Sequence, residues 1–429
     1  MRVLVIGGYG LIGGHIVAEL AAAGHQVVGA GRDVRAARRR FPFARWERCD
    51  LATFVDADWA PILAGVDAVI NCAGALQDSP RDDLVAVHVS GLATLARAAG
   101  TAGVARLIHI SAAGVSTSPG AFGRTKRAAE AALREQAVDW LILRPGLVLG
   151  PSAFGGSALL RGLAGFPFLL PCAFPDSLIQ VVAVRDVARA AVAAIQPGAP
   201  ARRVVDLVSA QAYPLRDILI RMRAWLGAPP APVLALPGVV AGAAALAADA
   251  LAWLGWRSPM RSTAMAQLRH GVRGDAASAS ALPGVRIADL DAILAASPSN
   301  VQERWFARLY FLKPLGLTTL ALFWAASGLG GLLATGRAAA VLIAAGFAPG
   351  AATLAVVVGA AADLLLAALV CHRRTAPLAL KGMVAVSATY LLGASLWRPD
   401  LWADPLGPLT KVVPTIVLAL VLLGLMEER

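Results

Sequence analysis

The sequence predicts an α/β protein built as a doubly wound parallel sheet, followed by an all-α transmembrane domain of four helices. Three observations support this. Over the first 300 residues, short apolar strands alternate with helical patterns, glycine-rich turns separate them, and after residue 312 long uncharged runs fill the chain. Alternating strands and helices are typical of a parallel sheet. Apolar runs of about 20 residues are typical of helices that cross a bilayer.

Composition agrees with a membrane-embedded part. Hydrophobic residues make up 58% of the 429 residues and charged residues 15%, against about 25% charged residues in typical soluble proteins. These values exclude a disordered chain or a nucleic-acid-binding tail. The net charge of +12 suits an anionic cofactor or a membrane surface. Neither the four scattered cysteines nor the six histidines show ligand spacing, so we predict no disulfide framework and no metal site.

Six strands and four helices are expected in the first part of the chain. The strands lie near residues 2–7, 26–30, 45–49, 67–71, 105–111 and 138–144, and the helices near 11–23, 53–64, 82–102 and 121–137. Three early strands and three later ones, each pair bridged by a crossover, form a doubly wound sheet. We expect one domain over residues 1–300, in which residues 145–300 form a smaller substrate lobe.

The second domain is expected over residues 312–429. Its four helices lie near residues 314–335, 351–371, 378–397 and 409–426, and residues 338–350 form a short helix or re-entrant segment. A further apolar run over residues 233–256 is interpreted as a buried or interfacial helix of the substrate lobe. A fifth span is the alternative.

Basic residues on the connections predict the orientation. One cluster precedes the first span and another separates the second span from the third, and both are expected on the cytoplasmic side together with residues 427–429. We therefore expect a multi-pass protein of the bacterial inner membrane, with its N-terminal domain and C-terminus in the cytoplasm. The two clusters are Arg304, Arg308 and Lys313, and Arg373, Arg374 and Lys381.

Gly7, Gly10 and Gly13 form a G-x-x-G-x-x-G pattern where the first strand passes into the first helix. Such glycines permit a tight turn, a close approach of the backbone to a pyrophosphate, and close packing of helix on strand. The phosphates then meet the exposed N–H groups at the helix N-terminus. The pattern predicts a dinucleotide site.

The residue after the second strand distinguishes between two cofactors. A carboxylate there holds the ribose hydroxyls of NAD, whereas a basic residue accepts the phosphate of NADP. Arg32 has this position, so we expect a preference for NADP(H). Asp33 beside it leaves NAD(H) possible.

Further motifs follow the predicted strands. Asp50-Leu51 follows the third strand, Asn71-Cys72-Ala73-Gly74 the fourth and Arg144-Pro145-Gly146 the sixth, and Val184-Arg185-Asp186-Val187-Ala188 comes later. With the glycine turn, these motifs resemble an extended or atypical short-chain dehydrogenase/reductase, a Rossmann-fold family. Over about residues 1–300 the closest similarity is to the branch that contains the nucleotide-binding accessory subunit of respiratory complex I. The resemblance implies that the Asp–Leu pair contacts adenine and that the Asn-x-Ala-Gly turn backs the cofactor. The cofactor-binding residues predicted are Gly7, Tyr9, Gly10, Leu11, Ile12, Arg32, Asp50, Leu51, Cys72, Ala73, Gly74, Ser111, Lys126 and Pro145.

The catalytic motif departs from that family. Its members use Tyr-x-x-x-Lys, in which the lysine lowers the pKa of the tyrosine and the tyrosine passes a proton to a carbonyl. Here Phe122 takes the tyrosine position, four residues before Lys126, and Ala113 takes the usual catalytic serine position. Lys126 and Ser111 are the remaining catalytic candidates, with Ser116 or Ser118 as possible substitutes for the missing serine.

Residues 312–427 resemble the DoxX-like family of four-helix membrane proteins. The similarity rests on Phe323-Trp324-Ala325-Ala326-Ser327-Gly328, on Asp363 and on Asp404-Pro405-Leu406-Gly407. Some members of that family work with quinone-linked thiol or thiosulfate oxidation. Because a charge facing lipid is costly, we expect Asp363 to face the bundle or to be protonated, in a hydrogen-bonded structural role rather than a proton or substrate role.

Two functions follow from these features. The first is a membrane-anchored, NADPH-dependent oxidoreductase that acts on a lipid-soluble or quinone-like acceptor. Its partners would be the bilayer and, as a further candidate, a quinone or a membrane redox protein. The second is a non-catalytic NADP(H)-binding sensor or assembly module, because Phe122 replaces the catalytic tyrosine. A third hypothesis, supported by Asp363 alone, is a transporter whose soluble domain reports the redox state.

Overall fold

The computed structural model describes residues 1–79, 82–256, 258–405 and 407–426. The chain divides into two compact units, Met1–Asp249 with Ser258–Ala307, and Ala250–Arg257 with Arg308–Arg429. Each unit is described here by itself. Residues 427–429, expected on the cytoplasmic side, and Leu406 of the DoxX-like motif lie outside the described residues.

The first unit contains a seven-stranded parallel sheet in the order β11-β6-β5-β4-β1-β2-β3. The six expected strands are present, and the reversal of order at β1 is that of a doubly wound sheet. The seventh strand, β11, pairs with β6 and was not predicted, because its five residues follow a Pro- and Gly-rich stretch that marks a loop. The strands are β1 (Arg2–Ile6), β2 (Gln26–Gly31), β3 (Arg45–Arg48), β4 (Ala68–Asn71), β5 (Arg106–Ile110), β6 (Trp140–Pro145) and β11 (Arg203–Leu207).

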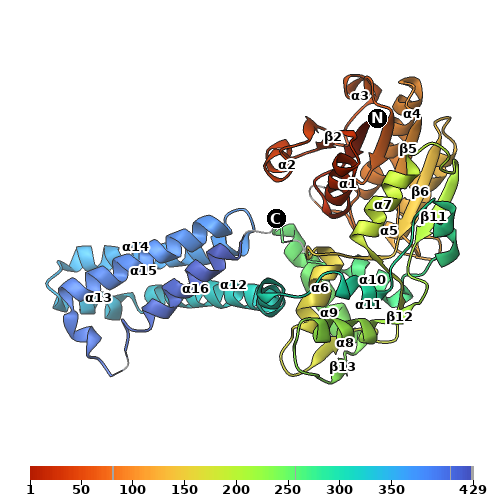
Figure 1. The fold of residues 1–429 in the computed structure, drawn as a ribbon. Helices are drawn as coiled ribbons and strands as arrows, with labels where there is room; N and C mark the ends of the chain where they lie inside the picture. The colour runs from red at the N-terminus through yellow and green to blue at the C-terminus, as the bar shows by residue number, and fades with distance from the viewer. Residues whose placement is uncertain (80–81, 257, 406, 427–429) are drawn as a thin grey trace. The chain divides into compact units, whose positions relative to one another are not determined.

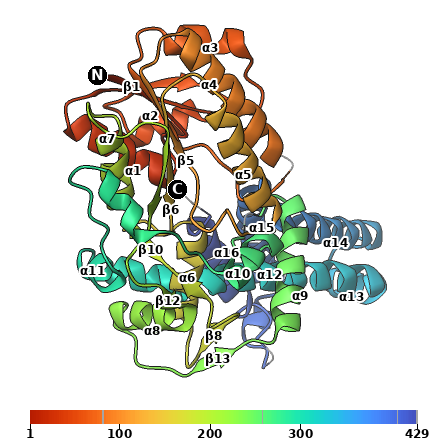
Figure 2. The ribbon, with the colours of Figure 1, turned by 90° about the vertical axis from the view of Figure 1, so that its right-hand side faces the viewer.

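Helices cover both faces of this sheet (Figure 2). Alternate residues of a strand point to opposite faces, so Val3 and Val5 of β1 pack with α1 and α7, whereas Leu4 and Ile6 pack with α3, α4 and α5. A short helix, α2, follows β2 and carries the basic residues after Arg32. The helices are α1 (Leu11–Ala22), α2 (Val34–Arg40), α3 (Asp56–Leu63), the π-helix η1 (Ala86–Ser90), α4 (Gly91–Thr101), α5 (Ala121–Arg134) and α7 (Val184–Ala194).

A smaller lobe is built on the sheet by residues that follow β6. It consists of three two-stranded ladders and several helices around its own apolar core. The ladders pair β7 (Leu147–Leu149) with β10 (Val181–Ala183), β8 (Leu170–Cys172) with β13 (Val233–Ala235), and β9 (Leu178–Ile179) with β12 (Tyr213–Pro214). The helices are α6 (Gly155–Ala164), α8 (Leu215–Trp225), α10 (Ser262–His270) and α11 (Leu290–Ala295). The 3-10 helix η2 (Ala276–Ala281) instead packs beside β11 in the core of the main sheet.

The second unit is helical (Figure 1). Among the described residues, three helices are long and apolar enough to cross a membrane, α12, α14 and α15, where the sequence predicted four. The fourth, α16, has 13 residues, about 20 Å at 1.5 Å per residue, because residues 409–411 form a turn instead of its first helical turn. The elements are α12 (Val301–Leu333), α13 (Thr335–Ala344), α14 (Pro349–Cys371), α15 (Ala376–Trp397), the 3-10 helix η3 (Pro399–Trp402) and α16 (Val412–Gly424).

Asp363 of α14 faces neighbouring helices, as its position in the sequence predicts. It is buried, and its carboxylate accepts hydrogen bonds from the Ser327 hydroxyl at 2.7 Å and from the Tyr390 hydroxyl at 3.4 Å. Ser327 lies on α12 and Tyr390 on α15, so this carboxylate joins three helices.

The apolar run over residues 233–256 forms the strand β13 and the helix α9 (Gly238–Trp253), which begins directly after Pro237. α9 has 16 residues, about 24 Å in length, less than the roughly 30 Å of a bilayer core. The alternative of a fifth span is therefore wrong for α9 by length.

Candidate dinucleotide site

The predicted cofactor residues gather at one edge of the sheet, because almost all of them follow the carboxyl ends of its strands. This is the edge at which doubly wound sheets bind their ligands. The turn from β1 to α1 carries Gly7 to Ile12, and Lys126 lies on α5 beyond β5. The others are Arg32 after β2, Asp50 and Leu51 after β3, Cys72, Ala73 and Gly74 after β4, Ser111 after β5, and Pro145 at the end of β6.

Two of the three glycines, Gly7 and Gly13, are required by the geometry of the first turn. Gly7 has a φ of +71°, a left-handed conformation that side chains disfavour. Its carbonyl accepts the N–H of Gly10 at 3.0 Å, and a Cβ on Gly13 would lie 2.3 Å from that carbonyl oxygen. The N-terminus of α1 has no acidic residue in its first turn, so its N–H groups suit a diphosphate.

The loop after β4 rests on this glycine turn. A Cβ on Gly7 would lie 2.9 Å from the Ala73 nitrogen, and Asn71 accepts the Ala73 N–H at 3.0 Å. Burial raises the pKa of the Cys72 thiol to about 12. Cys72 is therefore a neutral packing residue at physiological pH. We expect this loop to contact a cofactor through its backbone and not through the Cys72 thiol.

At the predicted adenosine end, Tyr9 covers the end of β2. A Cβ on Gly31 would lie 2.4 Å from the Tyr9 ring. The Arg32 guanidinium pairs with Asp82 at 2.8 Å while 44% of its side chain stays exposed. One carboxylate oxygen of Asp33 accepts the N–H of Ala36 and caps α2. Both the cation and the carboxylate beside it are thus exposed at this edge.

Asp50 and Leu51 hold the turn after β3. Asp50 accepts the N–H of Ala52 at 3.2 Å, and Leu51 is buried against the start of α4, where a Cβ on Gly91 would lie 2.1 Å from the Leu51 carbonyl oxygen. This contact fixes the backbone that precedes the predicted adenine-binding surface.

Lys126 defines the other end of the site. Its side chain is buried, its ammonium group donates to the Ile110 carbonyl at 3.0 Å, and a Cβ on Gly74 would lie 3.5 Å from its nitrogen. Burial lowers the pKa of Lys126 to about 8, although Glu130 and Cys72 act in the opposite direction. A buried amine with a pKa close to neutral pH is typical of functional sites.

His88, on η1, positions the loop beside Lys126, and the sequence did not predict a place for it in the site. Its Nε2 accepts the Ala75 N–H at 3.2 Å, and its Nδ1 lies 2.9 Å from the Thr125 hydroxyl of α5. Burial, and then the charge of Lys126, lower the pKa of His88 to about 3. The ring is therefore neutral and links two segments of the site. The only signal in the sequence was an imidazole within the apolar run V-A-V-H-V.

The proton-donating half of the family's motif is replaced in the structure as well. Phe122 and Lys126 lie one turn apart on α5, and the Phe122 ring meets the edge of His88 with centroids 5.8 Å apart. The Ser111 hydroxyl donates to Glu130 at 2.6 Å, and the Ser118 hydroxyl to Gln267 at 2.8 Å. Ser116 is exposed and Ala113 is buried. Both buried serines thus direct their hydroxyls to other protein groups.

Glu130 anchors α5 beneath this edge. It is 1% exposed and accepts hydrogen bonds from Ser111, from two nitrogens of Arg144, and from Arg134 at 3.2 Å. Since Glu130 lies one turn after Lys126, this network fixes the helix that carries Lys126.

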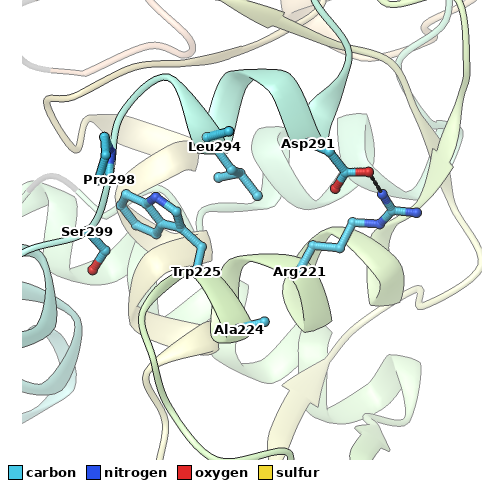
Figure 3. Close-up of a pocket in the computed structure, with 8 residues that line it drawn as sticks. Arg221, Ala224, Trp225, Asp291, Leu294, Pro298 and Ser299 are labelled. Atoms are coloured by element: carbon cyan, nitrogen blue, oxygen red, sulfur yellow. Dashed lines mark hydrogen bonds and ion pairs between the residues drawn. The ribbon is translucent and has the colours of Figure 1, made fainter.

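A separate hollow of about 450 Å³ lies between α8 and α11 in the smaller lobe (Figure 3). Its two charged lining residues, Arg221 and Asp291, pair with each other, and the Trp225 indole donates to the Ser297 carbonyl at 2.7 Å. It shares no lining residue with the predicted dinucleotide site. Within the described residues, no group of three or more His, Cys, Asp or Glu side chains could hold a metal ion.

Comparison with known proteins agrees with this geometry. Residues 7–165 match a family model of NAD(P)H-binding domains, and residues 321–420 match the model of the DoxX-like family. No curated protein is similar enough to this chain to count as a relative.

Several solved structures share the fold of the first unit. Triphenylmethane reductase from Citrobacter sp., complexed with NADP(H), is 18% identical with a TM-score of 0.55, over 69% of this chain and 100% of that one. An NADPH-dependent quinone oxidoreductase from Escherichia coli is 19% identical with a TM-score of 0.52, over 68% and 98%. The Bordetella bronchiseptica enzyme WbmH, in complex with NAD+, is 17% identical with a TM-score of 0.53, over 72% and 98%.

The two family-model matches lie in different parts of the chain, one within residues 1–300 and the other within residues 312–429, as the predicted division into two domains requires. The matched regions contain the glycine turn and Lys126 in the first part, and Ser327, Asp363 and Tyr390 in the second. The chain thus joins a region similar to NAD(P)H-binding domains, with the fold of these solved structures, to a region similar to the DoxX-like family.

Proposed function

We propose that this protein is a membrane-anchored oxidoreductase that transfers a hydride from NADPH to a lipid-soluble, quinone-like acceptor. The observation that carries the proposal is the buried Lys126 beside Gly74, at the sheet edge that also holds the glycine turn. The part of the chain that the structure describes also contains three helices that are apolar enough to cross a membrane. The known activities of the quinone and triphenylmethane reductases that share the fold support an acceptor of this class.

The loss of the tyrosine favours a quinone over a ketone. Hydride transfer to a ketone leaves an alkoxide, a strong base that needs a proton donor in the site, and Phe122 has no proton to give. Hydride transfer to a quinone leaves a phenolate-like anion, and phenols ionise near pH 10. Such an anion takes its proton from water, so NADPH, a quinone and one proton give NADP+ and a hydroquinone without a tyrosine.

Lys126 is expected to bind the nicotinamide ribose when the dinucleotide is present. Replacing it by methionine (Lys126→Met) removes a charge-assisted hydrogen bond and should lower kcat/KM with NADPH and a soluble quinone by about tenfold to a hundredfold. For the unaltered protein, kcat/KM should fall as the pH rises through about 8, because the ammonium loses its proton there. The measurement is the initial rate across pH for both proteins, and a pH profile unchanged by the substitution would contradict this role.

Arg32 is expected to favour NADPH over NADH through the 2′-phosphate. A charge-assisted hydrogen bond contributes about 1.5–3 kcal/mol, so Arg32→Ala should weaken NADPH binding by about tenfold to a hundredfold and leave NADH binding unchanged. Arg35→Ala, on the exposed face of α2, is the matched control. Titrations with both cofactors test this, and equal losses for NADPH and NADH in Arg32→Ala would exclude the assignment.

We also infer that the NAD(P)H-binding domain lies on the cytoplasmic side of a bacterial inner membrane. Arg304 and Arg308 precede the apolar part of α12, and Arg373 and Arg374 connect α14 to α15. An excess of such residues on connections is typical of the cytoplasmic side.

The alternative is a sensor or assembly module that binds NADP(H) without turnover. Phe122 and Ala113 favour it, since both replace groups that act in catalysis in the family. In that case Lys126→Met would leave NADPH oxidation at the background rate of the unaltered protein.

The deciding experiment uses the full-length protein in detergent with NADPH and a panel of quinones, ketones and aldehydes. We expect NADPH oxidation with quinones and none with ketones or aldehydes. Rates at background with every quinone, in protein that binds NADPH, would exclude the oxidoreductase and leave the sensor.

A further inference from the structure

The helix α9 exposes an uncharged apolar stripe. Val239, Leu246 and Trp253 are 84%, 69% and 78% exposed, and their spacing of seven residues places them on one face of the helix. Residues on the other side are buried and small, namely Ala241, Ala245, Ala248 and Ala252.

The single charged residue of α9 is used on its inner side. Asp249 pairs with Arg261 at 2.9 Å and accepts a hydrogen bond from Gln77 at 3.3 Å. The exposed stripe therefore lacks the charged residues that a helix in contact with water normally presents.

The end of α9 belongs to the unit of membrane helices. The Leu254 carbonyl accepts the Arg373 N–H at 2.9 Å, the Trp256 indole donates to the Cys371 carbonyl at 2.6 Å, and the Arg373 guanidinium lies 5.7 Å from the centre of a Trp256 ring. Cys371 ends α14, and Arg373 lies on the connection to α15.

This connection joins two helices that are long and apolar enough to cross a bilayer. In a bilayer that both helices cross, it lies at the boundary between lipid and water. The contacts of Leu254 and Trp256 place the end of α9 at the same level. Arg374 on the connection is exposed, and cations there are attracted to anionic headgroups.

We propose that α9 is an interfacial helix whose stripe of Val239, Leu246 and Trp253 is embedded in the lipid surface of the bilayer that α12, α14 and α15 cross. Tryptophan is enriched at this depth of a membrane, and apolar helix faces bind there by burying their side chains at the boundary of headgroups and acyl chains. The side chains of this stripe contact lipid, not a second protein chain.

Photocrosslinking of the full-length protein tests this. The photoreactive residue p-benzoylphenylalanine is introduced as Leu246→p-benzoylphenylalanine or Val239→p-benzoylphenylalanine, and the protein is reconstituted in vesicles of phosphatidylcholine and phosphatidylglycerol. The control is the same substitution at Val55, which is 60% exposed before α3. All three sites are exposed, so the substitutions should not prevent folding.

We expect lipid adducts at positions 246 and 239, detected by mass spectrometry of the irradiated protein, at least about tenfold above those at position 55. Adducts at or below the level of position 55, or a covalent dimer through position 246, would overturn the proposal, the latter in favour of a second copy as the occupant. Because no turnover is measured, failure here is distinct from failure of the proposed function.

Discussion

Glu130→Ala is expected to destabilise the NAD(P)H-binding domain by about 3–5 kcal/mol, the usual effect of removing one partner of a buried ion pair. Glu130 is almost fully buried and accepts hydrogen bonds from Arg144, Arg134 and Ser111. Without its carboxylate, the half-buried Arg144 keeps its charge and loses its closest partner. Urea denaturation of the full-length protein in detergent, followed by pulse proteolysis of this domain, measures the loss.

An exposed pair of similar geometry is the control. Asp56 accepts two hydrogen bonds from Arg97, at 2.9 and 3.0 Å, but both side chains are more than half exposed. Asp56→Ala should therefore change the free energy of unfolding far less than Glu130→Ala does, because water screens an exposed pair. Equal effects of Glu130→Ala and Asp56→Ala would show that burial does not determine the strength of these pairs.

Gly7→Ala is expected to weaken dinucleotide binding by about a hundredfold, which corresponds to about 2.7 kcal/mol. The left-handed φ of +71° disfavours any side chain, and the new Cβ would lie 2.9 Å from the Ala73 nitrogen and 3.0 Å from the Cys72 carbonyl carbon. To relieve these contacts the glycine turn must move away from the loop after β4. The diphosphate would then lose the N–H groups that this turn presents to it. Titration with NADPH measures the change.

Gly24 offers a matched control for the backbone strain. Its φ is +79°, but no heavy atom lies within 4 Å of a Cβ built there. Gly24→Ala should cost about 1–2 kcal/mol of stability through its left-handed backbone and leave the affinity for NADPH unchanged. A similar loss of affinity in both variants would attribute the effect to stability rather than to the site.

Local patterns predicted most of the sheet, because all of its first six strands except β3 (R-W-E-R) are short apolar segments bounded by turns. β11 was not predicted, because its five residues, R-V-V-D-L, become a strand only by pairing with β6. Likewise α16 matches an apolar run, yet its first residues form a turn, and it is too short for the span that composition predicts.

For the site, the glycine turn and Lys126 could be predicted because their spacing along the chain reflects local geometry. His88 and Glu130 could not, because their partners are distant in sequence. His88 meets Thr125 across 37 residues, and Glu130 meets Ser111 across 19. Ser111 shows what spacing along the chain does not predict. Its position matches the serine of the family's motif, but its hydroxyl donates a hydrogen bond to Glu130.

The claim on which the whole account depends is that a nicotinamide dinucleotide binds over the turn formed by Gly7, Gly10 and Gly13. Isothermal titration calorimetry of the full-length protein in detergent tests it most directly, with NADPH and NADH each added to wild-type protein and to Gly7→Ala. We predict saturable binding of one NADPH per chain, weaker binding of NADH, and loss of the NADPH signal in Gly7→Ala. Absence of binding heat with both cofactors, in wild-type protein whose circular dichroism shows it to be folded, would contradict the account.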